Sequence, residues 1–485
     1  MDHFFTSSDR VRRYWEPIPG VDLDAVAYVT RSGALPDGTP FFLDEAMRPA
    51  EPLSSFFRSE AKTLGASSLR DYTYDLLDVA DFLAGLEIPA DLLSATEDDL
   101  IAFRDDRTQY QDEPVSPATW RRRRVAINNF YGWAVDSGAL EHRPYHRRKN
   151  GRDVLAWGAV SQLDVRHLTF DQWRVFKDVG LRGLLPDGRV DPAFRGTAPL
   201  RNSCAADLAI NTGMRLREFS SLLDIEVGPP RRDGSARLVE LEAIAKYKLP
   251  RTVEIQDATL REIDLYRRIE RAQVVRRAAR TLALRREELF VVDDIDLRQM
   301  KLSGVLHGRR RTFTIKLMDA PLRRITVRET GQGLEPMALF VGRHGRMLSR
   351  QRWDQVFDAA QARCEAVVEE FGLELEMPRN IRIHDLRHTF AIFMLELLTQ
   401  LVLERAAKEI RDGGRSPAHL GEHLAGNAFL RVQQLLGHLR PESTMRYLRY
   451  IRRTNLLVAQ AVKAWNDQDT TFAEYAAREA RKAVA

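Results

Sequence analysis

The stretch QQLLGHLRPESTMRYLRY, from Gln433 to Tyr450, decides how the rest of the sequence is interpreted. It places His438 after a Leu-Gly pair, and Tyr447 follows an arginine nine residues further on. A helix, a turn and a second helix with a buried aromatic side chain would explain this spacing. The alternative is that Tyr447 is a nucleophile and that His438 helps to hold the group it attacks. The segment by itself leaves both interpretations open.

The composition favours a water-soluble, cytoplasmic protein with more than one domain. A chain of 485 residues is too long for a single core, and 44% apolar with 8% aromatic residues is ordinary for a globular protein. Two cysteines, Cys204 and Cys364, are too few for a disulfide framework or a structural zinc site, which suits a reducing compartment. The N-terminus lacks the apolar core of a signal peptide.

The distribution of apolar residues does not predict a membrane-spanning segment, and the net charge does not by itself predict a nucleic-acid partner. No stretch reaches the ~20 apolar residues that span a bilayer. The most apolar segment, FAIFMLELLTQLVL (Phe390 to Leu403), is interrupted by polar residues and predicts a buried helix. The net charge of +5 is small, although runs such as WRRRRVAINNFYGW and HGRRRTF permit a polyanionic partner. A solvated basic surface would explain each run equally well.

Apolar spacing and turn residues divide the chain into five segments. These are an N-terminal extension of uncertain role (1–66), a helical domain (67–145), a basic linker (146–167), a second, mostly helical domain (168–455) and a helical tail (456–485). Three- and four-residue apolar intervals from Leu69 onward predict a helix in the first helical domain. A further helix is predicted to start at Ser116, as the N-cap, with Pro117 in its first position.

The helix after Ser116 has an apolar face and basic residues away from it. The apolar face is predicted to contain Trp120, Ile127, Tyr131 and Ala134. Arg122 and Asn129 are predicted to point the other way, with Arg121 to one side. Arginines opposite a core stripe can lie along a phosphate backbone, so these three are candidate DNA-binding residues. Solvent exposure is about as good an explanation for each one singly.

The second domain opens with a capping box, Thr169 and Gln172, ahead of an apolar helix. The β-rich stretch from Ala236 to Ile255 predicts a strand, a turn and a strand. RTFTIKL and RRITVRE, between Arg311 and Glu329, are interpreted as a second hairpin. The predicted fold is therefore mainly α with small β-hairpins, an α+β class.

Four short pieces of the second domain contain the candidate chemistry. They are NTGMRLREF with Arg215 and Glu218, AKYKLPRTV with Lys246 and Lys248, IRIHDLRHTFA with His384 and Arg387, and the opening stretch with His438 and Tyr447. No single piece is specific, because histidines, lysines and arginines often occur at such spacings by chance. The evidence for a shared site is the order of the four pieces along the chain.

This ordered set resembles the tyrosine recombinases, the phage-integrase family of site-specific DNA recombinases. The resemblance implies that residues 67–145 are a core-binding domain that contacts DNA and that 168–455 are the catalytic domain. It implies a phosphate clamp of two arginines and two histidines, a hairpin lysine, a bracing acid and a nucleophile. By position these are Arg215, Arg387, His384, His438, Lys246 (with Lys248 as the substitute, itself a candidate DNA contact), Glu218 and Tyr447.

The resemblance also implies the reaction. Such enzymes cleave and rejoin DNA through a 3′-phosphotyrosyl intermediate, with no metal, cofactor or ATP. Their partners are double-stranded recombination sites, a tetramer of the chain on DNA and, in some systems, accessory proteins. An integrase or transposase of a mobile element is expected, with no membrane partner and with nucleoid association on DNA. Tyrosine must lose a proton during attack, and His384 is the predicted base.

Departures from the family pattern keep alternatives open. The intervals from Lys246 to His384 and from Arg387 to His438 are long, which predicts insertions. Tyr450, three residues after Tyr447, is a rival nucleophile. A type IB topoisomerase would share the pocket chemistry, and a non-catalytic DNA-binding protein could retain the fold. The sequence shows no evident cluster of carboxylate ligands, which argues against a metal-dependent nuclease.

Overall fold

The computed structural model describes residues 1–7, 35–146, 153–157, 165–411 and 427–450. The chain separates into two compact units, Met1–Gln162 and Leu163–Ala485, and each is described by itself. The helical tail predicted for 456–485 and the loop expected before His438 (412–426) lie outside the described residues, as does most of the predicted linker.

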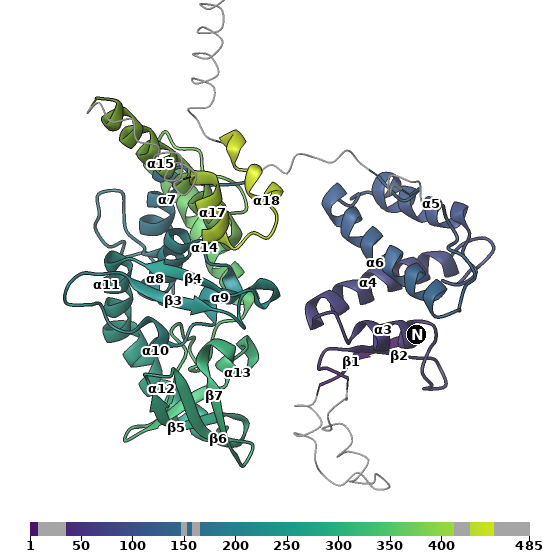
Figure 1. Cartoon of the computed structure of the whole chain (residues 1–485), viewed down its shortest axis with the longest axis horizontal. Coiled ribbons are helices and arrows are strands. Elements are labelled where there is room, and N and C mark those ends of the chain that lie inside the picture. Colours follow the sequence, from purple (N-terminus) through teal and green to yellow (C-terminus); the bar gives the residue numbers. More distant parts are fainter. Residues whose placement is uncertain (8–34, 147–152, 158–164, 412–426, 451–485) are drawn as a thin grey trace, which may run out of the picture. The chain divides into compact units, whose positions relative to one another are not determined.

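The first unit is a helical domain with a two-stranded sheet at its start (Figure 1). Strand β1 pairs antiparallel with β2, and α5 continues into a π-helical turn, Asp106–Tyr110. The elements are β1 (Asp2–Phe5), β2 (Pro40–Leu43), α3 (Leu53–Glu60), α4 (Ala66–Ala84), α5 (Glu97–Asp105) and α6 (Pro117–Asp136). Its core combines aromatic side chains from α3, α5 and α6 with aliphatic side chains, many of them from α4.

Helix α6 begins where the sequence predicts. The Ser116 hydroxyl accepts a hydrogen bond from the Thr119 N–H at 3.2 Å, and Pro117 occupies the first turn. The predicted apolar face is confirmed, because its four residues are all buried. These are Trp120, Ile127, Tyr131 and Ala134.

Arg122 and Asn129 lie away from the apolar face and are exposed, as predicted, but both also contact α4. Arg122 forms an ion pair with Asp75 of α4, and Asn129 Nδ2 donates to the Tyr72 hydroxyl at 3.1 Å. Helix α6 packs against α4 on the side that the sequence pattern leaves to solvent, so polar residues there meet a neighbouring helix. Arg121 is exposed.

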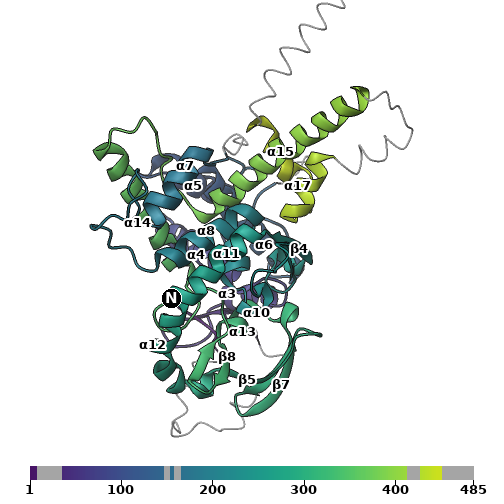
Figure 2. The ribbon, with the colours of Figure 1, turned by 90° about the vertical axis from the view of Figure 1, so that its left-hand side faces the viewer.

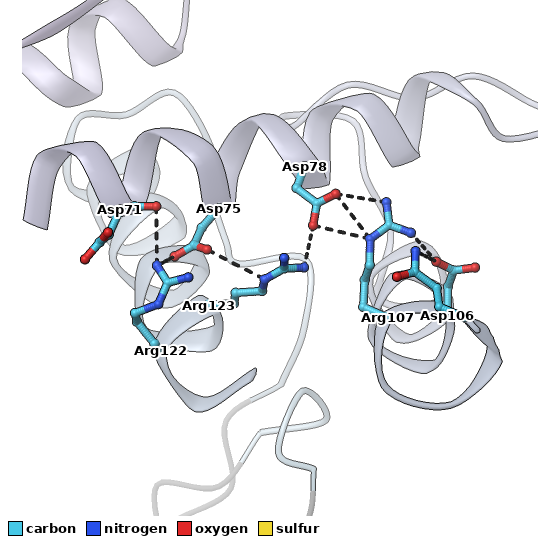
Figure 3. Close-up of polar contacts among 8 residues, drawn as sticks. Asp71, Asp75, Asp78, Asp106, Arg107, Arg122 and Arg123 are labelled. Atoms are coloured by element: carbon cyan, nitrogen blue, oxygen red, sulfur yellow. Dashed lines mark hydrogen bonds and ion pairs between the residues drawn. The ribbon is translucent and has the colours of Figure 1, made fainter. Parts of the chain in front are cut away.

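Figure 3 shows the acidic and basic side chains that join α4, α6 and the π-helical turn. Asp75 contacts Arg122 and Arg123, and Asp78 contacts Arg123 and Arg107, the latter at 2.9 Å. The Asp75 side chain is 2% exposed. Burial raises its pKa to about 6, against the lowering effect of the two arginines.

The second unit is built around α8, which contacts α11 and α15. In Figures 1 and 2, α15 lies beside α17 at one end of this unit and the larger sheet lies at the other end. Its helices are α7 (Phe170–Val175), α8 (Pro199–Thr212), α9 (Leu216–Ser220), α10 (Asp224–Val227), α11 (Asp257–Tyr266), α12 (Ala272–Ala283), α13 (Ala320–Arg324), α14 (Arg350–Glu370), α15 (Ile383–Arg411), α17 (Ala428–Leu436) and α18 (Glu442–Met445). Its strands are β3 (Arg237–Leu241), β4 (Arg251–Ile255), β5 (Phe290–Asp296), β6 (Lys301–Leu306), β7 (Arg309–Thr314), β8 (Thr326–Thr330) and β9 (Gly333–Pro336).

Two sequence predictions about this unit are confirmed. Thr169 and Gln172 form the capping box of α7, with side-chain contacts to each other's backbone N–H groups at 3.3 and 2.8 Å. Strands β3 and β4 form an antiparallel pair, with Lys246 to Lys248 in the turn between them. The fold is mainly α with small sheets, as the sequence predicts.

The second predicted hairpin is wrong. RTFTIKL contributes to β7 and RRITVRE to β8, but these strands lie apart in a five-stranded sheet of order β7-β6-β5-β8-β9. Strand β7 pairs with β6, and β8 pairs parallel with β5 and antiparallel with β9. Between β7 and β8 the chain forms α13, which Asp319 caps by accepting the Leu322 N–H at 3.0 Å. This cap and Pro321 start a helix where a tight hairpin turn would be required.

The apolar segment predicted as a buried helix is only partly buried. Phe390, Ile392 and Leu395 of α15 pack in a core cluster with α17. Leu397 and Leu401, further along the same helix, are 56% and 54% exposed. None of the described helices is both long and apolar enough to cross a lipid bilayer.

The raised pKa of Asp75 predicts a pH-dependent stability of the first unit. The folded state holds a proton on Asp75 up to about pH 6, whereas the unfolded state releases it near pH 4. Protonation of Asp75 therefore stabilises the folded first unit fully below about pH 4, and this stabilisation is lost as the pH rises through about 6. Relative to Asp75→Asn, the wild-type free energy of unfolding should fall by about 2 kcal/mol between about pH 4 and 7. Urea unfolding of the full chain, with the first unit followed by pulse proteolysis, measures this. Parallel pH profiles for the two proteins would contradict it.

Candidate active site

The turn between α8 and α9 sets the position of Arg215. Gly213 ends α8 with a φ of +62°, a conformation that favours glycine. A Cβ at this position would lie 2.4 Å from Phe390 Cδ1, so a side chain there would displace α15. Arg215 then caps α9, and its N–H donates to Glu218 Oε2 at 2.7 Å.

Glu218 is buried and joins two arginines. Its carboxylate contacts Arg215 Nη1 at 3.0 Å and also forms an ion pair with Arg251 of β4. Burial raises its pKa, but the charge of Arg251 and the Arg215 N–H outweigh this and lower the pKa below its usual value. The carboxylate is therefore ionised and fixes both guanidinium groups. Arg251 was not predicted from the sequence, because its contacts join residues that are far apart in the chain.

Arg387 lies at the start of α15 and is 1% exposed. Its guanidinium donates to the Gly213 carbonyl oxygen and to the Leu436 carbonyl oxygen. Burial, with the charges of Arg215 and Arg251, lowers its pKa to about 9, so it remains charged at neutral pH. Arg387 thus joins α15 to the turn before α9 and to the end of α17.

The hairpin turn and the end of α17 line a pocket of about 330 Å³. Lys246, Arg215, Arg251 and His438 all contribute to its wall. Lys246 is exposed, and its Nζ lies 5.0 Å from the centre of the Tyr247 ring. Lys248 is exposed and is not among the lining residues.

Gly437 ends α17 in the left-handed conformation, with φ of +61°, and directs the next residue, His438. His438 Nδ1 lies 2.9 Å from the hydroxyl of Thr444, which is buried. Burial, then the charges of Arg387 and Arg215, lowers the pKa of His438 to about 3. Its imidazole is neutral at neutral pH.

The two tyrosines of the opening stretch have different surroundings. Tyr447 is 1% exposed, and its hydroxyl lies 2.8 Å from Nδ1 of His388. Its ring is nearly parallel to that of His438, with 6.3 Å between centroids. Tyr450 lies elsewhere, because its hydroxyl accepts the Val165 N–H at 2.6 Å and its ring packs against His167. The structure therefore brings Tyr447, and not Tyr450, to the histidines.

His384 is not the residue that contacts the tyrosine. In the described part of the chain no hydrogen bond joins it to Tyr447, and His388, one turn further along α15, makes that contact. Burial and the charge of Arg387 lower the pKa of His384 to about 4, and Arg215 and Lys246 add to the effect. His388 was not predicted as a site residue from the sequence, although it belongs to the same motif as His384 and Arg387. Only its spacing of four from His384 signals a shared helix face.

The group as a whole is suited to an anion. Five cationic side chains are near Tyr447 or line the pocket: Arg446 and the four named next. Glu218 is the acid placed between two of them. The four are Arg215, Lys246, Arg251 and Arg387. Arg446 adds a positive charge beside Tyr447, where it lowers the tyrosine pKa against the larger raising effect of burial. Such fixed donors stabilise negative charge on a bound phosphate.

Comparison with known families identifies the first unit. Residues 57–138, which contain α4, α5 and α6, match the family "phage integrase, N-terminal SAM-like domain". The first unit contains a phage-integrase domain. The resemblance to the tyrosine recombinases predicted from the sequence is confirmed by this match.

Solved structures of integrases and recombinases are similar to this chain at low identity. XerH site-specific recombinase bound to its palindromic difH substrate has 14% identity and a TM-score of 0.43, with 86% of each chain covered. Lambda integrase bound to a COC′ core site has 12% identity and a TM-score of 0.43, over 82% of this chain and 94% of the other. The Tn1549 transposon integrase in complex with circular intermediate DNA has 11% identity and a TM-score of 0.42, over 81% and 94%. No curated protein matches the sequence. The likeness to phage integrases rests on the match at residues 57–138 and not on these superpositions.

The carboxylate of Glu218 should be essential for stability of the second unit. Glu218→Ala leaves Arg251, which is nearly buried, without its carboxylate, and such a loss costs about 3–5 kcal/mol. Glu254→Ala, on the exposed side of the same hairpin, is the matched control and should change stability by less than about 0.5 kcal/mol. Urea unfolding of the full chain, with the second unit followed by pulse proteolysis, measures both. Equal effects of the two substitutions would contradict the bracing role.

Proposed function

We propose that the chain is a site-specific DNA recombinase of the tyrosine type, which cleaves and rejoins DNA through a 3′-phosphotyrosyl intermediate. The observation that carries this proposal is the position of Tyr447. Its hydroxyl, the nucleophile, lies among His388, His438 and the cations Arg387 and Arg446. The phage-integrase domain at 57–138 supports the choice of DNA as substrate.

The two arginines of the predicted clamp have the roles that attack on a phosphodiester requires. Negative charge develops on the non-bridging oxygens, and a guanidinium offers paired, permanently charged donors to them. Arg215 is held by Glu218, and Arg387 by two carbonyl oxygens, so both are fixed before the phosphate arrives. Fixed donors lower the barrier because they need not reorganise during the reaction. His384 and His438, both neutral, would donate ring N–H groups to the same phosphate.

Lys246 is the proposed proton donor to the leaving 5′ oxygen. It stands on an exposed turn, beside the pocket that Arg215 and His438 line, so it can approach the phosphate from the open side. The bond to Tyr447 conserves the energy of the broken phosphodiester, so rejoining needs no ATP. Tyr447 is 1% exposed, so the side chains that cover its hydroxyl must move for DNA to reach it, while its contact to His388 is kept.

The test is covalent capture on DNA taken from either side of the gene that encodes the chain. The wild-type protein, incubated with this DNA in EDTA, should give a covalent adduct that survives a denaturing gel. Tyr447→Phe should abolish the adduct, because the nucleophilic oxygen is removed. Tyr450→Phe, which removes the hydroxyl that accepts the Val165 N–H, is the matched control and should retain the adduct.

Other outcomes would contradict parts of the proposal. Loss of the adduct only in Tyr450→Phe would show that Tyr450, and not Tyr447, is the nucleophile. The proposed reaction class would still hold. Relaxation of supercoiled DNA without joining of two sites would favour a type IB topoisomerase. Tight, specific binding without an adduct would favour a DNA-binding protein that does not cleave. Cleavage that stops in EDTA would favour a metal-dependent nuclease.

A further inference from the structure

His388 occupies a position that the proposed roles leave unassigned. It lies on the same face of α15 as His384, and the two rings are 4.4 Å apart between centroids, nearly perpendicular. Its Nδ1 is 2.8 Å from the hydroxyl oxygen of Tyr447. This is the atom that would attack the phosphate, so His388 touches the reacting group directly.

The protonation states of the pair define the direction of the hydrogen bond. Burial raises the pKa of Tyr447, so its hydroxyl keeps its proton at neutral pH. Burial also lowers the pKa of His388 to about 3, so its imidazole is neutral and has a lone pair on one nitrogen. A neutral phenol donates more readily than it accepts. The contact is therefore a phenolic O–H donating to an unprotonated Nδ1.

The groups that face His388 come from three segments. His384 and Arg387 are on its own helix, His438 follows α17, and Arg446 and Tyr447 belong to the segment after α18. After burial, electrostatic interactions with these histidines and arginines account for the lowered pKa of His388. A phosphodiester held by Arg387 would offset part of their positive charge, which raises the basicity of His388 when DNA is bound. The base would thus gain strength at the moment of attack.

We propose that His388 is the general base of the cleavage step and accepts the phenolic proton of Tyr447. This inference rests on the proposed function and assigns to His388 the role that the sequence gives to His384. The bond from Tyr447 Oη to phosphorus forms, and the bond from phosphorus to the 5′ oxygen breaks. The phenolic proton moves to Nδ1 of His388, and the 5′ oxygen takes a proton from Lys246. In rejoining, the 5′ hydroxyl attacks phosphorus and gives its proton back to Lys246, the bond from phosphorus to Tyr447 Oη breaks, and His388 returns its proton to the departing phenolate.

Two substitutions separate the chemical role of His388 from a structural one. Asparagine places an amide group near the position of Nδ1, so His388→Asn can keep a hydrogen bond to Tyr447 but cannot hold the transferred proton. His388→Ala removes both, and added imidazole can replace the lost base. His384→Asn, on the same helix face, removes a proposed phosphate contact and leaves the proposed base in place, so it serves as a comparison and not as a fully active control. Circular dichroism and DNA affinity check that all variants fold.

The substrate can isolate proton removal from proton donation. A duplex with sulfur in place of the bridging 5′ oxygen has a leaving group that departs without a proton. Lys246→Ala should therefore cleave this duplex at close to the wild-type rate. A variant that lacks the base should still cleave it slowly, because Tyr447 must still lose its proton. Single-turnover rates of adduct formation are measured on the sulfur-containing and normal duplexes between about pH 6 and 9.

His388→Asn should lower the rate at neutral pH by about 100-fold or more on both duplexes. Its rate should then rise about tenfold per pH unit, because the tyrosine must lose its proton to solvent. Unprotonated imidazole should restore His388→Ala. The inference is overturned if His388→Asn stays within about threefold of wild type, if sulfur rescues it, or if imidazole restores nothing. Absence of any wild-type adduct would instead overturn the proposed function.

Discussion

A single buried guanidinium, that of Arg387, holds the candidate site together. It joins the Gly213 carbonyl before α9 and the Leu436 carbonyl at the end of α17, and it comes from the start of α15. An arginine that is 1% exposed is tolerated only where its donors are satisfied, so these two carbonyls must stay in place. Because Gly213 precedes Arg215 and Leu436 precedes His438, the same contact fixes the positions of both.

Charge and burial then set the chemistry of the group. The pKa values of His384, His388 and His438 are all lowered, each by burial first and then by neighbouring positive charges, so the three imidazoles are neutral. The positive charge of the site therefore comes from its arginines and Lys246, while the neutral histidines can donate and accept hydrogen bonds. A buried, protonated tyrosine beside a neutral imidazole is poised to be activated only when an anion offsets the arginine charge.

The sequence predicted what depends on local patterns and failed where distant segments meet. The Ser116 cap, the Thr169 capping box and the β3–β4 hairpin follow from neighbouring residues, and all three are present. The order of motifs also predicted that Arg215, His384, Arg387, His438 and Tyr447 belong to one site. The partners of Arg122 and Asn129 were missed because helical periodicity does not say which second helix packs alongside. The Glu218–Arg251 pair and the His388–Tyr447 contact were missed for a similar reason: each joins residues that no local spacing relates.

The central claim is that Tyr447 becomes covalently attached to DNA. The most direct measurement is tandem mass spectrometry of the wild-type adduct after digestion with nuclease and protease. The account predicts one peptide bearing a nucleotide, with the phosphate ester on the phenolic oxygen of Tyr447 and the nucleotide joined through its 3′ oxygen. A nucleotide on Tyr450 or on any other residue, or a link through the 5′ oxygen, would contradict it.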